Sequence, residues 1–263
     1  MIKLKRNIAI LFCSIFLLFT SCGHKNELVE VEIPEREAFN IQKSDFPDPA
    51  TIKTKQGPFE MRGLPYNFND FHVIAKAESA FIHFDKVHLD YANRLNTAVH
   101  GTPFEKDEIT TLITRIDNRY ANLKNFSGAY YNHNIFWQSI NPKIESKPNE
   151  VLDKLIVESF GSMNELKSEL INKGNALVGS GWLWLIILPN GKLSVVTTIN
   201  NESPNMPELQ LGKPLLGIDL WEHAYFETYK NDKKAYIETC FKYLNWEKVN
   251  KEFIVDVEST EVK

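Results

Sequence analysis

Cysteine is scarce in this chain, and the three cysteines that it has cannot form a framework of disulfide bonds. Cys13 and Cys22 fall in an N-terminal targeting segment, which leaves Cys240 without a partner. A small fold held together by disulfides is therefore excluded, even in a compartment where disulfides could form. Large apolar residues surround Cys240 in the sequence, so we expect it to be a small residue of the core.

Positive charge is not in excess either. The formal net charge is -4, which gives no electrostatic case for binding to nucleic acid. No internal repeat is evident in the sequence. Apolar residues are plentiful by contrast: 43% of the chain is hydrophobic and 12% is aromatic. This composition predicts a sizeable core in one domain or two small ones, and it argues against disorder.

The first 22 residues have the features of a secretory signal. A basic start, "MIKLKRN", precedes an apolar run over 8–19 that is too short to span a bilayer. The run ends in "FTSC", which resembles a bacterial lipobox, although Phe19 stands where such boxes usually have leucine. The resemblance implies a lipid anchor on Cys22, and hence a protein held to the bacterial cell envelope outside the cytoplasm, on the periplasmic side or at the surface. Ordinary secretory cleavage nearby is the alternative.

The rest of the chain divides into a spacer, two folded parts and a tail. Residues 23–57 are rich in charged residues, asparagine and proline, which predicts a flexible tether. Apolar residues at helical spacing then predict a long helix, or two abutting ones, over 71–99. A second helix is expected over 105–123, and an aromatic third segment follows at 125–140. We take 58–145 as an N-terminal helical domain.

The period of the pattern changes in the second folded part, 146–253. Two helical stretches, 151–160 and 164–173, precede two apolar runs separated by "PNG", the signal of a β-hairpin. The stretch "PLLGIDLW" predicts a third buried strand, and helices are expected over 222–230 and 234–244. Helices followed by helices around a small antiparallel sheet make an α+β fold. The last ten residues, 254–263, are expected to form a weakly ordered tail.

Polar residues in apolar surroundings are the candidates for chemistry. His83 lies in a strongly apolar stretch, and His133 is flanked by aromatic residues; each alone is more typical of a core histidine than of a ligand. Asp219 ends the third apolar run, and His223 follows four residues later. A buried carboxylate is costly unless it is paired, hydrogen-bonded or bound to a metal. Three imidazoles and one carboxylate would suit a first-row metal such as iron, manganese or zinc.

Several motifs in a fixed order extend this interpretation. From about residue 64 to 249 the chain contains "LPY", "IHFDKVHLDY", "GTPFE", "NHNIFW", "SFGSMNELK", "GSGWLWL", "GKLSVVTT", "PLLGIDLWEHAY" and "LNWEKV". In these segments the chain resembles the iron/manganese superoxide dismutases. The resemblance implies an N-terminal helical hairpin followed by an α/β domain with a three-stranded antiparallel sheet.

The resemblance also implies an activity and a site. It gives one iron or manganese ion per subunit, held by His83, His133, Asp219 and His223, and superoxide as the substrate. Superoxide would be converted to dioxygen and hydrogen peroxide by one-electron cycling of the metal. The further site residues that it implies are Tyr91 at the mouth of the site, Lys86 and Lys233 in a cationic funnel, and Trp137, Trp182 and Trp221 in an aromatic shell.

One departure from the family affects control of the metal. The family tunes its metal-bound solvent with a glutamine from one of two positions. The position typical of iron enzymes is Ala129 here, and the position typical of manganese enzymes is Asn201, one methylene shorter than glutamine. We expect Asn201 to act in the outer sphere with weaker control of the metal potential. The choice between manganese, iron or tolerance of both stays open.

A second departure affects the expected homodimer. The family pairs a histidine and a tyrosine across its dimer interface, and Val87 and Phe226 stand at these positions. Losing both partners leaves no buried polar group unpaired. Glu222, which in the family reaches the partner's last histidine ligand, is present. We therefore expect a homodimer with part of its polar bridge replaced by apolar packing.

These departures keep other functions open. One alternative is a metal-binding envelope lipoprotein that keeps the dismutase fold with weak or lost activity, since fold alone does not give function. A further alternative is a different redox activity, such as peroxidase-like use of a poorly tuned iron.

Overall fold

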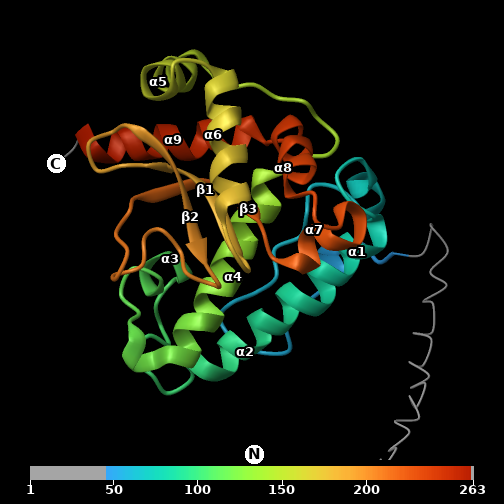
Figure 1. Cartoon of the computed structure of the whole chain (residues 1–263). Coiled ribbons are helices and arrows are strands. Elements are labelled where there is room, and N and C mark those ends of the chain that lie inside the picture. Colours follow the sequence, from blue (N-terminus) through green and yellow to red (C-terminus); the bar gives the residue numbers. More distant parts are fainter. Residues whose placement is uncertain (1–45, 262–263) are drawn as a thin grey trace, which may run out of the picture. The chain divides into compact units, whose positions relative to one another are not determined.

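A computed structural model of the chain describes residues 46–261 (Figure 1). The predicted signal peptide, Cys22 and most of the predicted tether lie outside these residues. No helix among the described residues is both long enough and apolar enough to cross a membrane.

Residues 46–57 lie against the folded part, although the sequence predicts a flexible tether here. They include a short 3-10 helix, η1 (Pro49–Thr51). The ring of Phe46 packs against Phe68 and Phe81, with ring centroids 6.2 and 5.4 Å apart. Further on, the Lys55 amide donates a hydrogen bond of 2.9 Å to Asn93 Oδ1. Aromatic packing and this backbone hydrogen bond therefore fix the segment to the domain.

The first long helix contains a change of winding. After the 3-10 helix η2 (Phe68–Val73), the chain forms α1 (Ala77–Ile82), then η3 (His83–His88), then α2 (Leu89–Val99). The η3 segment is π-helical, with hydrogen bonds from residue i+5 to i in place of i+4 to i. The sequence correctly predicts helix over most of 71–99, but it gives no sign of the π turn. Such turns are often found at functional sites.

The second predicted helix, over 105–123, is wrong in its extent. Only α3 (Ile109–Leu112) and the 3-10 turn η4 (Asn118–Tyr120) occupy this range before α4 (Ala121–Ser139) begins. The reason is Asp117, whose side chain accepts a hydrogen bond from the Arg119 amide. Aspartate competes for backbone groups in this way and so favours caps over helix interiors. The polar bond at Asp117 thus starts a new element where the apolar spacing predicts continuity.

The sequence correctly predicts the helical pair that opens the second half. These helices are α5 (Glu150–Phe160) and α6 (Met163–Ala176), each with a side-chain cap, from Asn149 and Ser162 respectively. Gly161 lies between them with φ of 91°, a left-handed conformation that favours glycine.

The sheet has three antiparallel strands in the order β2-β1-β3, which confirms the predicted α+β fold. The strands are β1 (Gly181–Ile187), β2 (Leu193–Ile199) and β3 (Lys213–Asp219). The register pairs Trp182 of β1 with Asp219 of β3. The chain ends with α7 (Glu222–Tyr229), α8 (Lys233–Lys242) and α9 (Trp246–Glu261). Thus α9 continues to Glu261, where the sequence predicts a weakly ordered tail.

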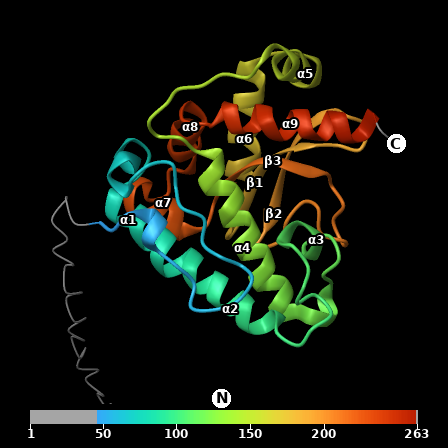
Figure 2. The same cartoon turned by 180° about the vertical axis from the view of Figure 1, so that it is seen from behind.

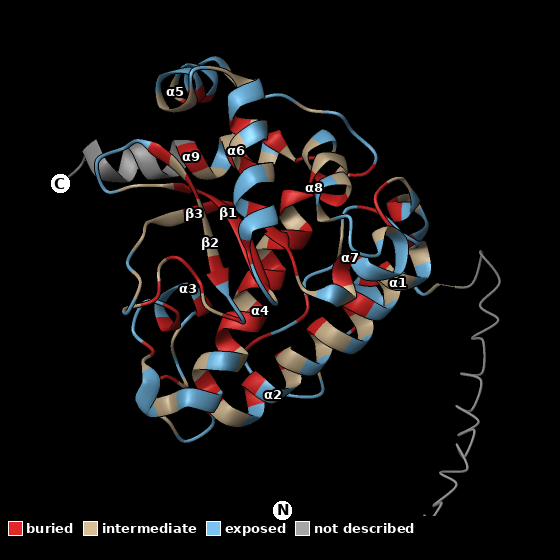
Figure 3. Ribbon diagram, viewed as in Figure 1, coloured by how far each residue is buried: buried red, intermediate tan, exposed pale blue. Residues whose placement is uncertain are grey.

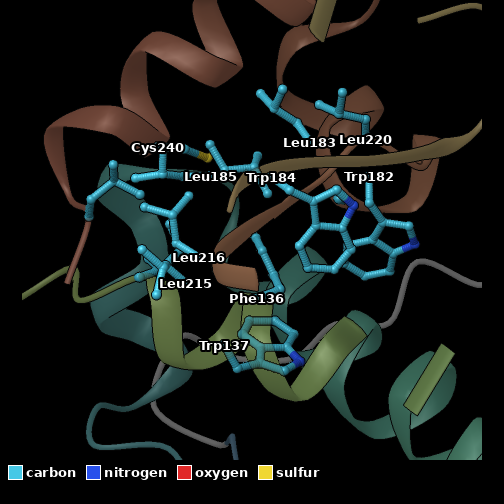
Figure 4. Packing of buried hydrophobic residues seen from close by; sticks show 14 of the residues in the cluster. Phe136, Trp137, Trp182, Leu183, Trp184, Leu185, Leu215, Leu216, Leu220 and Cys240 are labelled. Carbon is cyan, nitrogen blue, oxygen red and sulfur yellow. The ribbon is translucent and has the colours of Figure 1, made fainter. Parts of the chain in front are cut away.

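Helices cover both faces of the sheet. α4 and α9 contact β3, whereas α6 contacts β1 and β2, and Figure 2 shows α4 passing the sheet. Burial is concentrated on β1, on β3 and on the part of α4 next to them (Figure 3). Trp182 and Trp184 lie side by side near Phe136 and Trp137 of α4 (Figure 4). This aromatic core therefore surrounds the end of β3 at which Asp219 lies.

Candidate metal centre

Four side chains from different elements meet beside the aromatic core. His83 begins η3, His133 lies in α4, Asp219 ends β3, and His223 is the second residue of α7. The first two come from the helical half of the chain and the last two from the half with the sheet. A metal bound by all four would therefore tie the halves together.

The ligand atoms of these residues converge on one point. One atom from each of the four lies within 4.8 Å of the others. Asp219 Oδ2 is at the centre: it lies 3.1 Å from the Nε2 atoms of both His83 and His223, and 3.6 Å from Nε2 of His133. Three Nε2 atoms around one carboxylate oxygen form the donor set of a small metal site.

Backbone groups fix the orientation of two of the ligands. His133 Nδ1 lies 2.7 Å from the carbonyl oxygen of Ala129, one helical turn earlier, and donates to it. This bond leaves Nε2 without a proton and free to bind a metal. Asp219 Oδ1 accepts a hydrogen bond of 2.8 Å from the Trp221 amide, which turns Oδ2 toward the histidines.

Burial sets the charge of the site. It lowers the pKa of His83 to about 4 and the pKa of His133 well below its usual value. Burial alone would raise the pKa of Asp219, but His223 and His83 next to its carboxylate outweigh this effect and hold the pKa low. His83 and His133 are therefore neutral near pH 7, and Asp219 is ionised.

These residues fit an iron or manganese ion. The Nε2 atom of His133 is buried and forms no hydrogen bond with other described residues, and the buried Nε2 atom of His83 faces Asp219 Oδ2 at 3.1 Å without a well-aligned hydrogen bond. An unsatisfied buried nitrogen costs about 1–3 kcal/mol, and a metal ion would satisfy both atoms. A bound cation would also compensate the charge of Asp219, which is fully buried.

The three predicted tryptophans surround the histidine ligands. The ring centroids are separated by 4.7 Å for Trp137 and His83, 5.0 Å for Trp182 and His133, and 5.8 Å for Trp221 and His223. The indole nitrogens of Trp137 and Trp182 are buried without a hydrogen-bond partner among the described residues, whereas Trp221 donates to the Asn200 carbonyl. Bulky rings thus cover His83 and His133, whereas the side chain of His223 is 24% exposed.

The predicted tyrosine also lies at the site, but the two predicted funnel lysines differ in position. The ring of Tyr91 lies 5.8 Å from that of His133. Lys86 is exposed and forms an ion pair with the neighbouring Asp85. Lys233 Nζ donates to the Leu177 carbonyl at 2.9 Å, so its ammonium group is held at the backbone.

Asn201 is buried, and its side-chain amide is hydrogen-bonded to α4. Its Nδ2 donates to Asn125 Oδ1 at 3.0 Å, and its Oδ1 has no partner among the described residues. The backbone here packs tightly on α4: a Cβ at Gly128 would lie 2.0 Å from the Asn201 carbonyl oxygen. An outer-sphere role for Asn201 stays a prediction.

The three residues predicted at a dimer interface lie at or near the surface. Phe226 is 44% exposed, a high value for a phenylalanine, and Val87 is half-buried. Glu222 is exposed and accepts a hydrogen bond of 2.8 Å from Ser180 Oγ. An exposed apolar ring beside a carboxylate is compatible with a contact between subunits.

Sequence reasoning missed one histidine at the site. His88 is 1% exposed, and its ring lies parallel to that of His133, with centroids 5.1 Å apart and an angle of 16° between the planes. His88 follows His83 by five positions, a spacing that would put the two on different faces of an α-helix. The π turn η3 removes this difference, because residues five apart then lie one turn apart. Because the sequence does not mark this turn, the position of His88 beside His133 can be recognised only from the structure.

Comparison with known families agrees with this geometry. Residues 58–141 match the family model described as iron/manganese superoxide dismutases, alpha-hairpin domain. Residues 148–252 match the model described as iron/manganese superoxide dismutases, C-terminal domain. The two matches together cover more than half of the chain, and each contains two of the four clustered ligands. The chain belongs to the iron/manganese superoxide dismutase family.

Proposed function

We propose that this chain is a superoxide dismutase, which converts two superoxide ions and two protons into one dioxygen and one hydrogen peroxide. The observation that carries the proposal is the convergence of three histidine nitrogens on Asp219 within a buried aromatic cage. A bound iron or manganese ion would supply the one-electron chemistry, accepting an electron from one superoxide and passing it to a second.

The chain's own residues would prepare the site for an anionic substrate. His83, His133 and His223 would hold the ion as neutral imidazoles, and Asp219 would contribute a single negative charge. This low ligand charge leaves the centre attractive to superoxide. The exposed ammonium group of Lys86, partly offset by its ion pair with Asp85, would add local positive potential within a protein of negative net charge.

Tyr91 would manage protons, and the tryptophans around the ligands would manage water. Tyr91 carries a hydroxyl group, and its ring lies beside His133, so it is suited to hold a proton at the mouth of the site. The tryptophan rings around the ligands would exclude bulk water, which strengthens electrostatic interactions inside the site.

Metal preference would depend on Asn201. One N–H of its amide donates to Asn125, and its side chain is one methylene shorter than the family's glutamine, so its reach toward metal-bound solvent is restrained. Control of the metal potential would then be weaker than a glutamine gives, and use of manganese, iron or both is compatible with the residues present.

The same orientation of Asn201 favours a second candidate function. Weakly controlled bound solvent would slow dismutation, leaving a metal-binding envelope lipoprotein with the dismutase fold. The complete ligand set and the position of Tyr91 favour the enzyme.

Reconstitution separates the two functions. The chain without its first 22 residues is stripped of metal, loaded with iron or with manganese, and assayed for bound metal and for superoxide removal. We expect about one ion per subunit and dismutation with at least one of the metals. Full occupancy with no activity in either form would reject the enzyme and leave the metal-binding lipoprotein.

The location of the protein is proposed from the sequence. We propose a lipid anchor on Cys22 and a position in the bacterial envelope outside the cytoplasm, because "FTSC" follows an apolar signal. Partition into detergent and the mass of the mature N-terminus test this. Cys22→Ser should abolish acylation; an unacylated wild-type N-terminus would indicate ordinary secretory cleavage.

A further inference from the structure

His88 lies beside the metal centre without being one of its ligands. It ends the π turn that begins with His83, and it is buried. Its ring is stacked on that of the ligand His133, almost parallel, at 5.1 Å. The rings of Phe84 and Tyr130 hold it from other sides, at 5.7 and 5.5 Å. The imidazole is therefore confined in an orientation that presents its face to His133.

His133 receives a different contact on each part of its ring. The edge is fixed by the hydrogen bond from Nδ1 to the Ala129 carbonyl. Trp182 lies nearly perpendicular to it, with an interplanar angle of 79°. The stack with His88, at 5.1 Å and 16°, is shorter and closer to parallel than the stack of His133 with the ligand His223, at 5.8 Å and 19°. His88 is thus the neighbour best placed to hold the plane of this ligand.

Packing alone does not account for an imidazole here. Both ring nitrogens of His88 are buried and form no well-aligned hydrogen bond with the described residues, and the Tyr130 backbone nearby offsets the lowering of the ring's pKa only in part. Each unsatisfied nitrogen destabilises the folded state, whereas leucine would fill a similar space without that cost. The flat ring must therefore contribute something that an aliphatic side chain does not.

We propose that His88 is a positioning residue for the metal ligand His133, acting through the stack of the two rings. A metal bound at Nε2 draws electron density out of the His133 ring, which then carries partial positive charge. The electron-rich face of a neutral ring attracts such a charge. The stack therefore stabilises His133 more when metal is bound than when it is absent. This inference rests on the proposed metal centre but not on dismutase activity.

The test measures metal binding and metal-free stability separately. In His88→Leu we expect the dissociation constant for manganese to rise about tenfold, a change of about 1.4 kcal/mol. The metal-free protein should keep or gain thermal stability, because two unsatisfied nitrogens are removed. His88→Phe retains a flat face and should bind manganese within about threefold of the wild type. The exposed residue His100, changed to leucine, is the matched control and should leave both quantities unchanged.

The outcomes distinguish the inference from the proposed function. Unchanged manganese affinity in His88→Leu would overturn the positioning role. So would equal losses in His88→Leu and His88→Phe, or a parallel fall in metal-free stability and affinity, which is the signature of a merely structural residue. Wild-type protein that binds metal without dismuting superoxide would reject the proposed function alone. Wild-type protein that binds no metal would reject both.

Discussion

The four clustered ligands and the polar residues around them differ in where their polar atoms point. In the cluster, the nitrogens of His83, His133 and His223 all point toward Asp219. Outside it, polar groups are engaged elsewhere: Asn201 donates to Asn125, and Lys233 donates to the Leu177 carbonyl. We call Asn201, Lys233 and Glu222 the outer residues. A bound metal would leave the ligands little freedom, whereas each outer residue has an alternative partner within the protein.

The backbone explains this difference. His83 and His133 lie within helical segments, and Asp219 ends a strand that is hydrogen-bonded to β1. Regular structure fixes the direction of a side chain within narrow limits. Asn201 instead follows β2 in a turn, where a small change of backbone re-aims the side chain. The site therefore combines a rigid centre with adjustable surroundings.

Removing the central carboxylate should have the largest effect. Asp219→Asn keeps the shape but loses the negative charge, so we expect metal affinity to fall at least 100-fold and activity to disappear. Metal analysis after dialysis measures the loss, and Asp153→Asn, at an exposed position on α5, is the control. Retained metal in Asp219→Asn would mean that the ion binds elsewhere.

Acid should destabilise the rigid centre. Burial lowers the folded-state pKa of His83 to about 4 and that of His88 to about 3, whereas a histidine of the unfolded chain titrates near 6.5. Below pH 6.5 the unfolded chain therefore binds protons that the folded chain does not, and stability falls with pH. The loss continues to about pH 4 for His83.

The size of this effect can be measured on the metal-free protein. His83 alone should contribute about 3 kcal/mol of stability at pH 7 that is lost by pH 4. Denaturant unfolding at a series of pH values gives the slope. His83→Leu should reduce the slope between pH 6.5 and 4, and an unchanged slope would show that this histidine is not held neutral.

Substitutions at the expected dimer contact should have non-additive effects on the stability of the dimer. Val87→His or Phe226→Tyr alone would add a polar group without its partner, and we expect either to weaken the dimer about tenfold. The double variant should recover most of the loss, because the two groups can pair. Sedimentation of the single and double variants measures this. Additive losses, or no dimer in the wild type, would remove these residues from the contact.

The sequence predicts the centre better than its surroundings for physical reasons. Asp219 is recognisable because a carboxylate at the end of an apolar run demands compensation. His88 is not, because its contact with His133 depends on a π turn that leaves no clear mark in the sequence. The direction of Asn201 is equally hidden, since whether its amide binds Asn125 depends on the packing of a turn against α4. Helix limits fail where a polar bond, as at Asp117, overrides apolar spacing.

The smallest effect, and the sharpest test of the comparison, concerns Asn201. Asn201→Gln adds one methylene, which would let the amide extend past Asn125 toward the ligands. If the outer residues tune the metal, the ratio of activities with iron and with manganese should change several-fold while the amount of bound metal stays constant.

Asn125→Ala provides the complementary variant, because it frees the Asn201 amide without lengthening it. A change in ratio in both variants would mean that the pairing of Asn201 with Asn125 restrains the tuning residue. An unchanged ratio in both would mean that Asn201 does not contact the bound solvent, and that the centre sets its potential without this residue.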